Sequence, residues 1–203
     1  MNTKDWTGNS RTAHAIIGAR NYATEEREEN DYYATEPLAT EFLLQLETFS
    51  PYIWECACGG GHISEVLKQH GYFVYSSDLV NRGYGVEHDF LSEAPPPIND
   101  YDIITNPPYS KAMEFVNQAL DFVTEGHKVA MFLKVQFLEG KTRWKDLYKD
   151  RPPKTVYVSS ARLHCALGGQ FDKYAKSNAI AYAWYVWQKG FSGDPVVKWF
   201  NHD

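Results

Sequence analysis

The 203-residue chain is predicted to form an α/β fold with a largely parallel sheet. Short apolar runs alternate along it with longer stretches in which apolar residues recur at helical spacing. Three glycine-rich or polar motifs also follow directly after apolar runs, where ligands bind in folds of this kind. Because 43% of the residues are hydrophobic, the chain can bury one substantial core.

Helical spacing and turn residues divide the chain into elements. We expect helices at 37–49, 62–71, 110–126 and 136–150. We expect strands at 52–57, 72–78, 101–106, 128–134, 155–160, 179–187 and 195–200. Pro37 suits the first turn of the first helix, which is expected to bury Leu38, Phe42, Leu43 and Leu46 on one face.

The sequence predicts a polar N-terminal segment followed by one domain. Residues 1–30 are polar and end in the charged run TEEREEN, so they are expected to form an N-terminal arm. Residues 31–203 are expected to form a single domain. No signal peptide is recognisable, and no apolar run reaches the roughly 20 residues of a membrane-spanning helix, so no membrane association is expected.

Three cysteines bear on location and metal binding. An odd count without a regular framework indicates free thiols in a reducing compartment, and so a cytoplasmic location. Cys56 and Cys58 form a single C-x-C with no second pair near it, which argues against a zinc site.

Charge is unevenly distributed along the sequence. Residues 1–126 carry 20 acidic and 7 basic side chains, whereas residues 127–176 carry 11 basic and 4 acidic ones. The net charge of −6 argues against a protein that coats nucleic acid non-specifically. The basic segment is a candidate phosphate-contacting face, although a solvated surface would have the same composition.

A glycine turn separates the first strand from the second helix. Gly59, Gly60 and Gly61 follow the strand that carries Glu55, and Asp78 ends the next strand nineteen residues after Gly59. Glycines let the backbone approach a ligand closely, and a carboxylate at this distance commonly accepts hydrogen bonds from ribose hydroxyls. The pattern predicts a nucleoside-binding βαβ unit. It lacks the complete G-x-G-x-x-G, which argues against a dinucleotide.

The stretch ITNPPYS places an asparagine and two prolines at the end of a strand. The side-chain carbonyl of Asn106 and the backbone carbonyl of Pro107 can present two acceptors in a fixed relation. A planar amine can donate its two N–H groups to them, which localises its lone pair and positions the nitrogen for attack. Tyr109 supplies a ring that can stack on the planar group.

NPPY after an apolar strand resembles the catalytic motif of amino-methyltransferases that use S-adenosylmethionine. These enzymes methylate adenine N6, cytosine N4 or, in one branch, a glutamine side-chain amide. The resemblance implies a Rossmann-like class I methyltransferase fold, with a mainly parallel seven-stranded sheet and an antiparallel C-terminal hairpin. It also implies S-adenosylmethionine as the cofactor.

The resemblance assigns roles motif by motif over residues 31–135. The catalytic motif is Asn106, Pro107, Pro108 and Tyr109. The cofactor ligands it implies are Tyr33, Thr35, Pro37, Glu55, Gly59, Gly61, Asp78, Asp89 and Phe90. One of Tyr182, Trp184 and Tyr185 would face the target base.

The compact form is similar to phage- and prophage-encoded DNA adenine-N6 methyltransferases, so we expect DNA as the partner. The chain has little room for a separate recognition domain, and the basic segment would then contact phosphates. Its candidates are Arg143, Lys145, Arg162 and Lys176. The alternatives are RNA adenine, cytosine N4, a protein glutamine, or a cofactor- or nucleic-acid-binding protein without catalysis. Cytosine-C5 chemistry is disfavoured, because no cysteine follows a proline in the expected loop.

Overall fold

The computed structural model describes residues 32–160, 163, 165–167, 169 and 180–201. The predicted arm, Arg162 and Lys176 lie outside these residues. Among those described, no helix is both long and apolar enough to cross a membrane.

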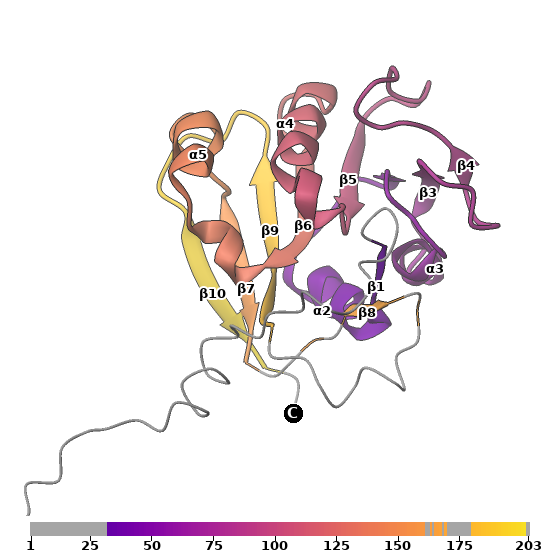
Figure 1. Ribbon diagram of the computed structural model, residues 1–203, viewed down its shortest axis with the longest axis horizontal. Coiled ribbons are helices and arrows are strands. Elements are labelled where there is room, and N and C mark those ends of the chain that lie inside the picture. Colours follow the sequence, from indigo (N-terminus) through magenta and orange to yellow (C-terminus); the bar gives the residue numbers. More distant parts are fainter. Residues whose placement is uncertain (1–31, 161–162, 164, 168, 170–179, 202–203) are drawn as a thin grey trace, which may run out of the picture.

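An eight-stranded sheet forms the middle of the molecule (Figure 1). Its strands, from one edge to the other, are β10 (Val196–Phe200), β7 (Thr155–Ser159), β9 (Tyr182–Gln188), β6 (Lys128–Lys134), β5 (Tyr101–Thr105), β2 (Tyr52–Glu55), β3 (Phe73–Asp78) and β4 (Val86–Glu87). All neighbouring strands are parallel except β9, which is antiparallel to both β6 and β7. The predicted α/β fold with a mainly parallel sheet is confirmed.

The C-terminal strands differ in one respect from the expected seven-stranded arrangement. The antiparallel pair at this end of the sheet is β7 with β9, joined over the register Thr155↔Val186. The last strand, β10, does not pair with β9 but lies beyond β7 and parallel to it, which adds an eighth strand at the edge. The alternating run of residues 195–200 predicts a strand, but its partner depends on contacts distant in sequence.

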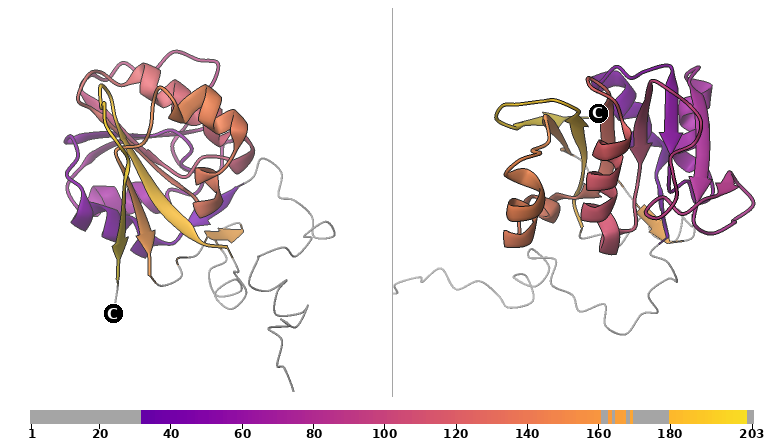
Figure 2. Two further views of the ribbon diagram at one scale, coloured as in Figure 1. Left: turned by 90° about the vertical axis from the view of Figure 1, so that its left-hand side faces the viewer. Right: turned by 90° about the horizontal axis from the view of Figure 1, so that it is seen from above.

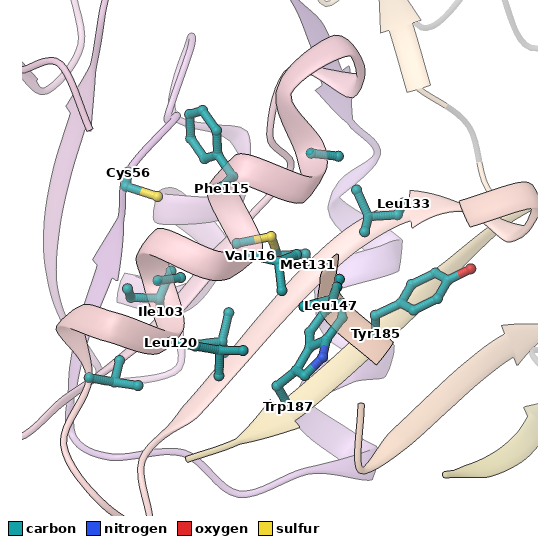
Figure 3. Close-up of a cluster of buried hydrophobic side chains, with 14 of the residues drawn as sticks. Cys56, Ile103, Phe115, Val116, Leu120, Met131, Leu133, Leu147, Tyr185 and Trp187 are labelled. Carbon is teal, nitrogen blue, oxygen red and sulfur yellow. The ribbon is translucent and has the colours of Figure 1, made fainter. Parts of the chain in front are cut away.

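Helices cover both faces of the sheet (Figures 1 and 2). On one face lie α2 (Pro37–Leu46) and α3 (His62–Gln69), which bury Leu43 and Leu67 against the central strands. On the other face α4 (Ala112–Phe122) buries one apolar stripe against β5, β6 and β9. Figure 3 shows this second cluster, in which Val116 and Leu120 of α4 pack beside Ile103, Met131 and Trp187.

Two details of the helices depart from prediction. The expected helix at 136–150 is broken into a 3-10 turn (Val135–Leu138), a short α5 (Lys141–Arg143) and a π-type turn (Trp144–Tyr148). Gly140, with φ at 138°, interrupts it. In α2 the expected buried face was wrong at Leu38, which is 38% exposed, because the buried stripe passes through Ala39, Thr40 and Leu43.

A separate two-stranded ribbon lies beside α2 (Figure 1). It pairs β1 (Tyr33–Thr35) antiparallel with β8 (Cys165–Leu167), so that Thr35 faces Cys165. The ribbon joins a segment before the first helix to one that lies far along the chain. It thereby brings Tyr33 and Cys165 to the ends of the central strands.

Candidate functional site

A cavity of about 260 Å³ lies at the carboxyl ends of the central parallel strands. This is the edge where ligands bind in folds of this kind. Eight of the predicted site residues line it: Tyr33, Thr35, Glu55, Asp78, Asp89, Phe90, Asn106 and Pro108. Five others lie around it without being part of its lining: Pro37, Gly59, Gly61, Pro107 and Tyr109.

The glycine turn shapes one wall of the cavity. Gly59 and Gly61 have φ values of 52° and 84°, which disfavour residues with a Cβ atom. A Cβ on Gly59 would overlap the Tyr32 ring, and the Gly60 N–H donates to the Tyr32 hydroxyl at 3.0 Å. Tyr32 therefore lies directly across the turn, a contact for which the sequence carries no signal beyond its position next to Tyr33.

Asp78 ties the end of β3 to this turn. Its Oδ2 accepts from the Gly59 N–H at 2.8 Å, and its Oδ1 accepts from the Val80 N–H at 2.9 Å. Arg82 lies 3.3 Å from the same carboxylate and 4.5 Å from the centre of the Tyr32 ring. Arg82 was not expected, because an arginine four residues after the strand matches no general pattern. It gives the cavity a positive charge beside the carboxylate predicted to hold a ribose.

Glu55 lies at the end of β2 and is fully buried. Ser64 of α3 donates its hydroxyl to Glu55 Oε2, and the Ser76 hydroxyl lies 2.6 Å from that of Ser64. Burial raises the pKa of Glu55 from 4.5 to about 8, despite the hydrogen bond. The carboxyl group is therefore largely protonated at neutral pH unless a cation enters the cavity beside it.

Phe90 and Asp89 supply an apolar surface and a carboxylate to the cavity lining. Phe90 is 2% exposed, stacks on Phe115 with ring centres 4.7 Å apart and meets Trp54 edge-on. The neighbouring Asp89 has a lowered pKa, mainly because the Ser92 hydroxyl donates to it. A planar heterocycle with an amino group would find both an apolar surface and an acceptor here.

Asn106 follows β5 directly and has a fixed orientation. Its Nδ2 donates to the backbone carbonyl of Tyr33 at 2.8 Å and lies 3.7 Å from Cys165 Sγ. Its Oδ1 is buried and has no hydrogen-bond partner among the described residues. Because Nδ2 is held by the ribbon, the carbonyl oxygen is left as an acceptor at the cavity.

Tyr109 lies among other aromatic rings. It stacks on Tyr33 with ring centres 5.7 Å apart and on Tyr182 at 5.9 Å, and its hydroxyl donates to Cys165 Sγ at 3.2 Å. Burial raises the pKa of Tyr109 well above its usual value.

The structure separates the three aromatic candidates of β9. Trp184 is fully buried and donates Nε1–H to the Ala39 carbonyl at 2.7 Å. Tyr185 is also fully buried, in the cluster beneath α4, and donates its hydroxyl to backbone carbonyls after β6. Of the three, Tyr182 is the one that stacks beside Tyr109.

Arg143 and Lys145, the two predicted phosphate contacts that the structure describes, are not part of the cavity lining. Arg143 donates to the carbonyl of Glu139, and its guanidinium lies 5.1 Å from the centre of the Phe137 ring. Lys145 has an 83% exposed side chain whose ammonium lies 4.0 Å from Asp146. Arg162 and Lys176 lie outside the described residues.

Comparison with known proteins gives a fold but no family. No protein-family model matches the chain, and no curated protein matches it. Among solved structures, a Listeria monocytogenes protein assigned as a class I S-adenosylmethionine-dependent methyltransferase is 9% identical, with a TM-score of 0.58 over 93% of this chain and 71% of that one. A Pyrococcus horikoshii protein assigned as an RNA methyltransferase is 15% identical, with a TM-score of 0.58 over 91% of this chain and 100% of that one.

A Thermotoga maritima S-adenosylmethionine-dependent O-methyltransferase is also similar in structure. It is 12% identical, with a TM-score of 0.50 over 89% of this chain and 73% of that one. At these identities the likeness concerns the fold. The chain therefore has the class I methyltransferase fold, and its chemistry must be argued from its own residues.

Proposed function

We propose that the protein transfers a methyl group from S-adenosylmethionine to the exocyclic N6 amine of adenine in DNA. The observation that carries this proposal is Asn106. Its amide nitrogen is held by the Tyr33 carbonyl, and its Oδ1 is a buried acceptor without a partner among the described residues. An amine donor would satisfy that oxygen, and buried acceptors are rarely left unpaired.

The chemistry of the cavity residues supports this cofactor. The volume of about 260 Å³ is slightly below the range of about 300–1,000 Å³ that ligand pockets span. Asp78 would hold the ribose hydroxyls, and Asp89 with Phe90 would hold the adenine. Glu55 also lines the cavity, where a cationic methionine portion would lower its raised pKa.

When bound, S-adenosylmethionine would supply an electrophilic methyl group on a sulfonium. The protein's part is to position the acceptor. Asn106 Oδ1 and the Pro107 carbonyl would accept hydrogen bonds from the two N–H groups of the amine, which makes the nitrogen lone pair available and aims it. S-adenosylhomocysteine would be the leaving group, and the methylated nitrogen would lose one proton to solvent. Because Nδ2 is bonded to Tyr33, the Asn106 amide cannot rotate to present a donor instead. No metal ion is needed for these steps.

Aromatic rings lie at the proposed catalytic motif, which favours a planar substrate. The Tyr109 ring lies within stacking distance of the rings of Tyr33 and Tyr182. The Lys134 ammonium also lies 4.6 Å from the centre of the Tyr109 ring, so a base that stacks on Tyr109 must displace one of these neighbours. An adenine in a duplex must in addition be flipped out of the helix to reach the pocket.

Product identification tests the proposal. The protein would be incubated with methyl-labelled S-adenosylmethionine and, separately, unmethylated DNA, total RNA and lysate protein, and the product would be digested and identified by mass spectrometry. We expect N6-methyladenine in the DNA. Label on cytosine N4, in RNA or on glutamine would overturn the substrate, and cofactor binding without any transfer would support a non-catalytic binding protein.

A further inference from the structure

Among the described residues of the basic segment 127–176, lysines lie at both ends of the sheet. Lys128 begins β6, at the edge away from the cavity, and its ammonium binds Glu47 at 2.6 Å and the Thr48 carbonyl at 2.7 Å. Lys154 precedes β7 at the same edge and donates to Gln188 at 2.6 Å. These two lysines join elements at the end of the sheet opposite the site.

Two arginines of the segment are also held by neighbouring groups. Arg151 lies 2.8 Å from Asp121 of α4, and Arg143 donates to backbone carbonyls of the turn before it. Positive charge in this part of the sequence is therefore a poor guide to a phosphate-binding face, because several of its members tie helices and strands together.

Lys134 differs from them in position. It ends β6, at the edge where Asn106 follows β5, and its backbone carbonyl accepts the Tyr185 hydroxyl at 3.1 Å. Its ammonium lies 4.6 Å from the centre of the Tyr109 ring. The strand fixes the backbone, while the long side chain places its ammonium beside Tyr109 of the proposed catalytic motif.

We propose that Lys134 contacts the phosphate that flanks the target nucleotide, and so favours a base within a strand over a free nucleoside or a glutamine side chain. This inference rests on the proposed function. A charge-assisted hydrogen bond to a phosphate is stronger than a cation–π contact, so a phosphate of an entering strand can compete with the Tyr109 ring for the ammonium. Lys134 would then be a specificity-determining residue that acts on substrate binding.

The salt dependence of binding tests this proposal. Affinity for an adenine-containing duplex oligonucleotide would be measured from 50 to 200 mM KCl with S-adenosylhomocysteine present, for the wild type, Lys134→Gln and Lys134→Arg. Lys149→Gln is a matched control, since Lys149 is an exposed lysine of the same basic segment. We expect Lys134→Gln to reduce the slope of log affinity against log salt by about 0.9, the value for one phosphate contact in B-DNA.

Kinetics separate this role from a structural one. Lys134→Gln should raise KM for the oligonucleotide several-fold and leave kcat and cofactor affinity unchanged, and Lys134→Arg should restore KM. An unchanged salt slope, or a loss of kcat and cofactor binding together, would overturn the assignment to Lys134 alone. If the wild type methylates protein or free nucleoside and not nucleic acid, the proposed function and this inference fail together.

Discussion

Buried Glu55 should make the protein less stable as pH rises. Its pKa is about 8 in the folded protein against 4.5 when exposed, so between these values the folded state holds a proton that the unfolded state has released. The free energy of unfolding therefore falls through this window and is level above it. At about 1.4 kcal/mol per pKa unit, the carboxyl costs about 3 kcal/mol of stability between pH 5.5 and 8.

Glu55→Gln should remove this dependence. Glutamine keeps a carbonyl oxygen that can accept from the Ser64 hydroxyl, so its folded structure should match that of the protonated wild type. Urea unfolding of both proteins would be measured at pH 5.5, 7 and 8.5 without ligand. Because the other titratable groups are common to both, the difference in the free energy of unfolding isolates Glu55.

We expect the variant to be close to the wild type at pH 5.5 and more stable by about 3 kcal/mol near pH 8. A difference that stays constant with pH would show that Glu55 titrates near its usual value. A difference of opposite sign would show that the ionised carboxylate is the favoured form in the folded protein. Either result would refute the reasoning from burial.

Three further substitutions test the packing that positions the site, each by urea unfolding. Gly61→Ala should cost about 2 kcal/mol or more, because a Cβ at φ 84° is strained and would lie 2.5 Å from the Tyr84 ring; a neutral effect would show that the turn adapts. Trp184→Phe should cost about 1–3 kcal/mol by removing the indole hydrogen bond to the Ala39 carbonyl and part of a fully buried ring, and a stable variant would mean that water replaces the indole. Asp102→Ala should cost about 3 kcal/mol or more, since its carboxylate accepts from a histidine and two backbone N–H groups, and a smaller loss would show that these donors find other partners.

Local patterns predicted part of the cavity lining. Asp78 and Asn106 each end an apolar run, and parallel strands bring such ends to one edge of a sheet. Glu55 likewise ends a strand, and the glycine turn lies a few residues after it. These positions are set by short-range spacing and by the sheet, which is why one sequence was sufficient to group them.

Contacts between distant segments were not predictable. Tyr33 and Cys165 meet Asn106 only because β1 pairs with β8, and no local pattern states that register. Composition alone also does not place charges in space: Lys128 and Lys134 of the basic segment lie at opposite ends of one strand. The choice of Tyr182 over Trp184 likewise needed the three-dimensional packing.

The central claim is that Asn106 acts on the amine and not on the cofactor. Methyl transfer to DNA and calorimetric binding of S-adenosylmethionine would be measured side by side for the wild type and Asn106→Ala, with thermal unfolding as a check on folding. We predict that transfer is abolished while cofactor affinity stays within a few-fold of the wild type. A folded variant that keeps transfer, or that loses cofactor binding along with it, would contradict the role given to this residue.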